Sequence, residues 1–124
     1  MQLPIRRTQV ESQAGFIVVW EFRIQSTKRR AFERAYGPEG DWAKFFRKAK
    51  AYLGTELIQD AREPDRYLTI DYWKSRKHYE DFKEQNRKMY QLIDVRCEAL
   101  TSAEFEIGQF NRRASKTAKL KRGV

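Results

Sequence analysis

Four residues that could do chemistry follow one another at the end of a predicted strand and the start of a predicted helix. Asp71 lies among strand-forming residues, and Trp73, His78 and Tyr79 come soon after it. Carboxylate, imidazole and phenol groups can exchange protons with a substrate, and an indole ring can stack on an aromatic ligand. We therefore consider His78, Tyr79 and Asp71 as candidate catalytic acids or bases.

Each of these residues also has a purely structural interpretation. Trp73 is either a core aromatic or a pocket wall that stacks on an aromatic substrate. His78 falls in the first turn of a helix, where the helix dipole disfavours a cation, which favours a solvent-facing ring. Asp71 and Glu21 lie within strands, where each either pairs with an Arg or Lys of a neighbouring strand or acts as a base with a raised pKa.

Aromatic residues supply a wider set of candidate binding residues. The chain has eight Phe, six Tyr and three Trp, enough to fill a core, line a pocket or face a subunit. The candidate substrate-binding residues are Trp73, Tyr79, Phe82, Trp42 and Trp20. The tyrosines that could place a hydroxyl in a pocket are Tyr36, Tyr67, Tyr79 and Tyr90. The helix stripe around Trp42 is either core or a lid over such a pocket.

Metal and cofactor sites lack the residue spacing that they need. His78 is the only histidine, and no Cys or carboxylate stands at metal-ligand spacing from it. The glycines match neither a dinucleotide-binding loop nor a phosphate-binding loop. We expect no metal and no cofactor.

The elements that position these residues centre on a β-hairpin at 52–73. Two strand-like arms flank a turn at 60–65 that contains two Asp and a Pro. Ser75 is then the predicted N-cap of a helix from 76 to about 90. The other predicted elements are a strand at 16–24, a helix at 28–36, a short helix capped by Asp41, a helical segment at 92–100 and a strand at 103–110.

This order predicts an α+β fold of the ferredoxin-like βαββαβ type, with helices on one face of a four-stranded antiparallel sheet. The first strand has one face with Phe16, Val18 and Trp20 and another with Ile17 and Val19. Helices would cover only one of these two apolar faces. We expect a second copy of the chain to cover the other, sheet against sheet.

Charge divides the chain into three parts. The net charge is +9, and residues 111–124 contribute six of the cations with no acid. We interpret 1–14 as a flexible N-terminal arm, 15–110 as the folded domain and 111–124 as a basic C-terminal tail, either solvated or weakly attracted to nucleic acid or another polyanion. No apolar run predicts a membrane span or a signal peptide, so we expect a cytoplasmic protein.

Three stretches resemble the antibiotic biosynthesis monooxygenase family of dimeric α/β-barrel proteins. They are FIVVWEFRI, YLGTELIQD and DRYLTIDYWKSRKHYEDF, within about residues 15–110. The resemblance implies a homodimer whose sheets close into a barrel, with a pocket between sheet and helices in each subunit. It also implies a cofactor-independent monooxygenase-like protein acting on a small aromatic or conjugated substrate.

Departures from the family pattern keep a second function open. Many members carry a His about nine residues past the strand-terminal Trp, where this chain has Phe82. The haem-degrading relatives use an Asn on the first strand and a helical His, and neither is matched here, so the resemblance transfers no haem ligand. The alternative is a non-catalytic, dimeric small-molecule-binding barrel.

Overall fold

A computed structural model describes residues 14–113, and it contains four strands and four α-helices. The elements are β1 (Phe16–Arg23), the 3₁₀ turn η1 (Ser26–Lys28), α2 (Arg29–Tyr36), α3 (Asp41–Phe46), β2 (Tyr52–Gln59), β3 (Arg66–Trp73), α4 (Arg76–Gln85), α5 (Arg87–Cys97), the 3₁₀ turn η2 (Glu98–Leu100) and β4 (Ala103–Asn111). The predicted hairpin is confirmed, with a connection at 60–65.

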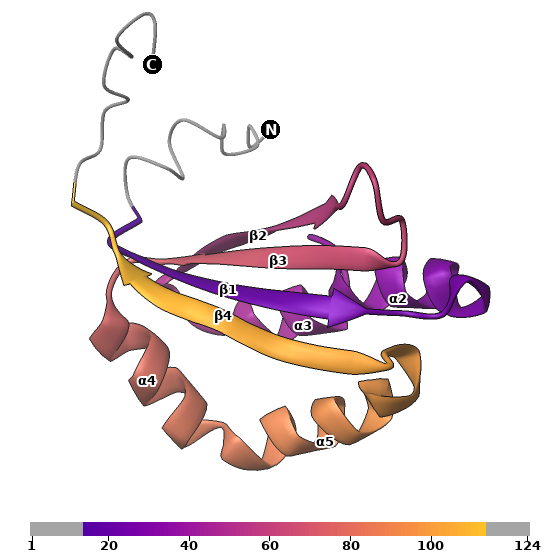
Figure 1. Cartoon of the computed structure of the whole chain (residues 1–124). Helices are drawn as coiled ribbons and strands as arrows, with labels where there is room; N and C mark the ends of the chain where they lie inside the picture. The colour runs from indigo at the N-terminus through magenta and orange to yellow at the C-terminus, as the bar shows by residue number, and fades with distance from the viewer. Residues whose placement is uncertain (1–13, 114–124) are drawn as a thin grey trace, which may run out of the picture.

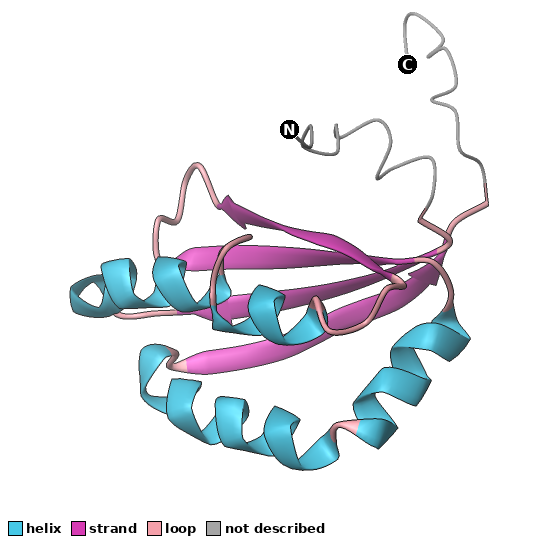
Figure 2. Cartoon of the chain, turned by 180° about the vertical axis from the view of Figure 1, so that it is seen from behind, coloured by secondary structure: helices cyan, strands magenta, loops and turns pink. Residues whose placement is uncertain are grey.

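The four strands form one antiparallel sheet in the order β2-β3-β1-β4. All four helices lie on one side of this sheet, with α4 and α5 following one another beneath β1 and β4 (Figure 1). The view from behind shows the same two-layer arrangement, with α2 and α3 beneath the other half of the sheet (Figure 2). The predicted ferredoxin-like α+β fold is therefore confirmed.

Alternation along β1 decides which side chains meet the helices. Phe16, Val18 and Phe22 are each at most 5% exposed, whereas Ile17 and Val19 on the other face are only half-buried. The core between the layers is largely aromatic, and its rings pack mostly in tilted or edge-on contacts. Such rings bury large apolar areas, so the sheet and the helices are fixed against each other at the site described below.

The helices begin and end differently from the sequence-based predictions at two points. Asp41 is the predicted cap of α3, but the N-cap is Gly40, and an added Cβ there would lie 2.2 Å from the Arg34 carbonyl oxygen. The helix predicted to run to about residue 90 breaks at Asn86, whose side-chain amide donates to the Phe82 carbonyl and competes with the backbone. Ser75 caps α4 as predicted, accepting a bond from the His78 amide.

A β-bulge in β2 changes the direction of its first side chains. The pairing register with β3 shifts between Tyr52 and Gly54, and Gly54 has φ +135°, a conformation that residues with a Cβ rarely adopt. In a regular strand, positions three apart point to opposite faces. The bulge instead brings the Tyr52 hydroxyl within 2.5 Å of Thr55 Oγ1.

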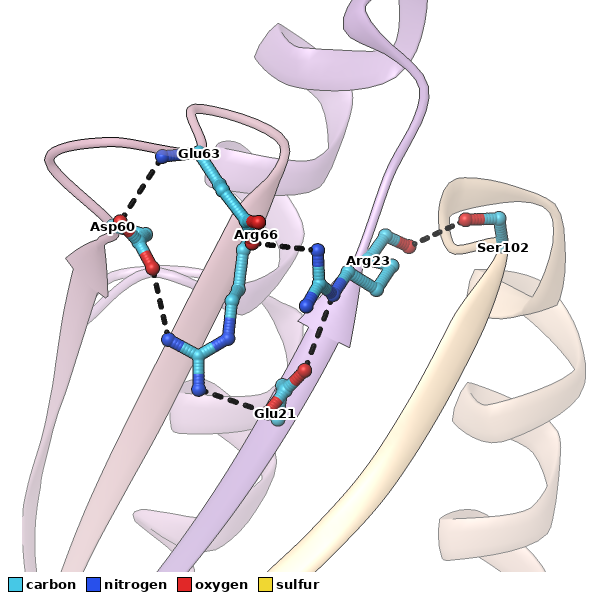
Figure 3. Close-up of polar contacts among 6 residues, drawn as sticks. All are labelled: Glu21, Arg23, Asp60, Glu63, Arg66 and Ser102. Atoms are coloured by element: carbon cyan, nitrogen blue, oxygen red, sulfur yellow. Dashed lines mark hydrogen bonds and ion pairs between the residues drawn. The ribbon is translucent and has the colours of Figure 1, made fainter.

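An ion-pair network joins β1, β3 and the hairpin turn on the face away from the helices (Figure 3). Arg66 bonds both Glu21, at 3.0 Å, and Asp60, at 2.9 Å, and Arg23 bonds Glu21 and Glu63. The bond from Arg66 lowers the pKa of Glu21. The predicted pairing of Glu21 with a basic residue of a neighbouring strand is confirmed.

Some predictions fall wholly or largely outside the described residues. These are the flexible arm at 1–14, of which only Ala14 is described, and the basic tail, of which 114–124 are not. None of the helices within 14–113 is long and apolar enough to cross a membrane.

Replacing Gly54 by Ala tests the bulge. The added Cβ meets no neighbouring atom, so any loss of stability reports the positive φ alone. We expect Gly54→Ala to lower the free energy of unfolding by about 1–3 kcal/mol, measured by urea denaturation. Lys50→Ala, an exposed replacement just before the same strand, is the control, and equal stability of the two variants would contradict the assigned backbone conformation.

Candidate active site between the sheet and the helices

A cavity of about 110 Å³ lies between the sheet and helices α2, α3 and α5. Its aromatic lining consists of Trp20, Phe22, Tyr36, Trp42, Phe46 and Tyr90. Its polar lining consists of Thr55, Thr69, Asp71, Asp94 and Glu104. Six rings and three carboxylates therefore line one cavity, which makes it the candidate site.

Asp71 is the buried carboxylic acid of this cavity. Its side chain lies on the helix-facing side of β3, between Val18 of β1 and Thr55 of β2, which are its partners in strand register. The expected pairing with Arg or Lys is wrong for Asp71, since none of the ion pairs among residues 14–113 includes it. Burial raises the pKa of Asp71 from 3.8 to about 6, partly offset by a bond from Thr55.

A short hydrogen-bond chain leads from Asp71 to Tyr52. Thr55 Oγ1 donates to Asp71 Oδ1 at 2.5 Å, so its single proton is used and the Tyr52 hydroxyl must donate to Thr55. If Asp71 takes up a proton, both bonds of this chain can reverse direction. The arrangement therefore holds the carboxylate in place and accommodates both of its protonation states.

Exposed acidic side chains lie near two of the tyrosine hydroxyls that line the cavity. Asp94 of α5 and Glu104 of β4 are solvent-exposed, and the Tyr36 hydroxyl donates to Glu104 Oε1 at 3.3 Å. Burial, followed by the charge of Asp94, raises the pKa of Tyr90 to about 12, and burial and Glu104 raise the pKa of Tyr36. Both phenols therefore stay neutral hydrogen-bond donors at neutral pH.

The Trp42 indole N–H is a buried donor without a well-aligned acceptor. Its Nε1 atom is buried and makes no well-aligned hydrogen bond within 14–113, but it lies close enough to the Tyr36 hydroxyl to lower the pKa of that phenol against the larger effect of burial, and its ring lines the cavity. An unpaired buried N–H costs on the order of 1–3 kcal/mol. A ligand oxygen in the cavity is one group that could pair with it.

The structure brings some of the sequence-predicted residues to this cavity and keeps others apart. Trp20, Trp42 and Asp71 line it. Trp73 is fully buried, and Tyr79 and Phe82 pack against it in the core, so these three rings do not line the cavity. His78 is exposed on α4, where Ser75 Oγ lies 2.6 Å from its Nδ1.

Several lining residues were not singled out from the sequence. Thr55 could have been found by counting outward from the hairpin turn, because the observed register places it directly opposite Asp71. Phe22 and Phe46 belong to predicted apolar faces, but nothing separated them from other core residues. Asp94 and Glu104 carry no sequence signal, because they lie among other charged residues and meet only through the packing of α5 beneath β4.

No grouping of three or more His, Cys, Asp and Glu side chains in the described residues could hold a metal ion.

The sequence profile of one family, antibiotic biosynthesis monooxygenase, matches residues 15–87. No curated protein matches the chain in sequence.

Solved structures with this fold include several oxygenases. SnoaB from Streptomyces nogalater, a cofactor-independent oxygenase solved in a mutant form, is 16% identical with a TM-score of 0.59, covering 90% of this chain and 99% of that one. The monooxygenase ActVA-Orf6 of Streptomyces coelicolor, solved with nanaomycin D, is 14% identical with a TM-score of 0.64, covering 86% and 95%. A Pseudomonas aeruginosa protein is 17% identical with a TM-score of 0.59, covering 82% and 96%.

Burial of Asp71 predicts a specific pH dependence of stability. Because the folded state holds a proton that the unfolded chain releases above about pH 4, stability falls as pH rises to about 6, by about 3 kcal/mol in all. The side chain of the Asp71→Asn variant cannot ionise, so this variant does not lose stability in this way as the pH rises. We expect urea denaturation to show that the variant gains stability relative to the native chain between about pH 4 and pH 7.

The exposed replacement Asp81→Asn is the control for removing one carboxylate. A stability difference between Asp71→Asn and the native chain that is the same at both pH values would show that Asp71 is not buried as an acid.

Proposed function

This chain belongs to the antibiotic biosynthesis monooxygenase family, and on that premise we propose that it is a cofactor-independent oxygenase of small phenols. The observation that carries the proposal is the buried Asp71 carboxylate, which faces an aromatic cavity and has no counter-ion among the described residues. A phenol in this cavity would stack on the indole and phenol rings and meet a base with a pKa suited to neutral pH.

The proposed reaction converts a phenol to a quinone with molecular oxygen. A ring C–H and the phenolic O–H are lost, one oxygen atom enters the ring as a carbonyl, and the other leaves as water. The substrate supplies all four electrons. Asp71 accepts the phenolic proton, and the electron-rich phenolate then transfers an electron to oxygen.

Recombination of the two radicals forms a C–O bond and a peroxide. Asp71 returns its proton to the peroxide, and loss of water with the ring hydrogen gives the carbonyl. The base is therefore regenerated within one turnover, and the bonds from Thr55 and Tyr52 keep the carboxylate oriented in both states. Thr55 is a positioning residue in this scheme, because it acts through Asp71.

The Trp42 Nε1–H group would act in this scheme as a hydrogen-bond donor to the phenolate. A phenolate oxygen next to it would give the indole N–H a well-aligned acceptor in place of the Tyr36 hydroxyl, and its charge would be stabilised by a donor that is already in place. The binding residues that we propose are thus Trp42 and Trp20, with Asp71 as the base. Trp73, Tyr79 and Phe82 support the cavity through the core.

Oxygen consumption with a panel of dihydroxybenzenes and larger quinols tests the proposed activity. We expect the rate to rise with pH and level off above about 6, the pKa of Asp71, since only the carboxylate form accepts a proton. Asp71→Asn should lower the rate about 10²-fold or more. Mass spectrometry with ¹⁸O₂ should find one labelled atom in the quinone.

Thr55→Val separates positioning from catalysis. The bond from Thr55 lowers the pKa of Asp71, so its loss should move the midpoint of the pH profile upward without abolishing activity. If Asp71→Asn consumed oxygen as fast as the native chain, Asp71 would not be the base of the reaction. Tight binding of phenols without any oxygen uptake would contradict the oxygenase proposal and indicate a ligand-binding protein instead.

We also propose that two copies of the chain associate through the sheet face opposite the helices. Phe105 and Phe110 of β4 are 54% and 47% exposed and lie opposite Glu21 and Ile17 in register, so they share that face with Val19. No described segment covers these apolar groups. A second sheet would remove them from water.

Sedimentation of matched variants tests this association. We expect the native chain to sediment as a dimer at micromolar concentration and Phe105→Asp to shift it towards the monomer, because the new charge would be buried between sheets. Leu92→Asp, at a 61% exposed apolar position on α5, should remain dimeric. A native chain that sediments as a monomer would contradict the proposal.

A further inference from the structure

The charge of the cavity contrasts with that of the chain. The protein carries 26 Lys and Arg residues and a net charge of +9, yet no basic residue lines this cavity in the described structure. Three carboxylates line it, those of Asp71, Asp94 and Glu104. A fourth, that of Glu106, contributes with these three to the raised pKa of Tyr90. The cavity is therefore a negative region within a positively charged protein.

Within the described residues the outer carboxylates make no ion pair, although Arg76, Lys83 and Arg87 line the neighbouring groove that Asp94 also borders. Glu104 accepts bonds from the neutral hydroxyls of Tyr36 and Thr101, and none of the ion pairs found within 14–113 includes Glu104 or Asp94. The cation closest to this region in ring contacts is Lys83 of α4, which lies 5.0 Å from the Tyr90 ring centroid and outside the cavity lining. Free carboxylates at the opening can pair with a cationic ligand.

The aromatic lining favours the same kind of ligand. The faces of Trp and Tyr rings attract cations, and the contact of Lys83 with Tyr90 shows that this ring already takes part in such an interaction. Trp20, Tyr36 and Trp42 offer further rings around the cavity. An anionic ligand would instead meet both the carboxylates and the negative ring faces.

The volume limits what can be enclosed. A cavity of about 110 Å³ is smaller than the roughly 150 Å³ that enclose one benzene ring, so it excludes multi-ring ligands and admits a single ring only where lining side chains move or part of the ligand stays outside. Among the lining carboxylates Asp71 is buried, whereas Asp94 and Glu104 are exposed. A ring with its hydroxyl towards Asp71 would extend its side chain towards the two exposed carboxylates.

We infer that the cavity selects single-ring phenols that carry a protonated amine, with Asp94 and Glu104 binding the ammonium group. This inference rests on the proposed function for the orientation of the phenol, but the preference for a cation follows from the lining itself. It narrows the substrate from small phenols in general to phenolic amines.

Three catechols of similar size and different charge test the inference. They are dopamine, which is cationic, 4-ethylcatechol, which is neutral, and 3,4-dihydroxyphenylacetate, which is anionic. Calorimetric titration of the full chain without oxygen should show dopamine binding about tenfold more tightly than 4-ethylcatechol, as expected from one cation–π contact and exposed ion pairs. The anion should bind most weakly, and added salt should reduce the differences.

Paired variants identify the groups responsible. Asp94→Asn combined with Glu104→Gln should bring dopamine within about threefold of 4-ethylcatechol, because the ion pairs are lost and the ring contacts remain. Asp81→Asn combined with Glu98→Gln removes two exposed carboxylates outside the cavity lining and should keep the tenfold preference. Equal affinities in the native chain, or a full tenfold preference that survives in the first pair, would overturn the inference.

These outcomes are independent of the oxygenase proposal. Dopamine preference without oxygen uptake would support the inferred selectivity and contradict the reaction. Oxygen uptake with no difference among the three catechols would support the reaction and contradict the selectivity.

Discussion

The arrangement of this protein depends on a carboxylate buried between a sheet and a helical layer without a cation to neutralise it. Asp71 is 8% exposed, and its neighbours in the sheet are an aliphatic side chain and a hydroxyl. Burying such a group disfavours its charged form, and the raised pKa expresses that cost. The surrounding aromatic core offsets the cost, because Phe46 packs at once on the core indole of Trp73 and on the cavity indole of Trp42.

The β-bulge at Gly54 aligns the hydrogen-bond chain that supports this buried carboxylate. Without the shift at Gly54, Tyr52 and Thr55 would point to opposite faces, and Asp71 would lose the second donor of its hydrogen-bond chain. The site therefore depends on backbone geometry as well as on side-chain identity. A catalytic carboxylate needs this kind of support, since a group with an uncompensated cost of burial would otherwise draw water into the cavity.

The fold was predictable from the sequence because its signals are local. Alternation along residues 16–24, the turn residues at 60–65 and the Ser75 cap each depend on neighbouring positions, and the structure has the corresponding elements. The break at Asn86 was missed because it arises from a side-chain bond that competes with an otherwise continuous helical pattern.

The cavity was only partly predictable, because the pattern of β3 is misleading. Leu68 and Ile70 mark an apolar face, yet they point away from the helices, and it is Thr69 and Asp71 that face them. When both faces of a sheet are apolar in part, periodicity shows that there are two faces and not which one the helices cover. The exposed carboxylates are harder still to foresee, since Asp94 and Glu104 meet only in the folded chain.

The two faces of the sheet are coupled because the same strands carry side chains to both of them. Trp20 lines the cavity, while the adjacent Glu21 enters the ion-pair network with Arg66 on the other face (Figure 3). A network that joins β1, β3 and the hairpin turn fixes the relative positions of these strands, and hence of Trp20 and Asp71. Contacts made on the outer face would therefore hold the inner wall in one geometry. The proposed association through the sheet would for this reason also preorganise the cavity, and not only cover apolar surface.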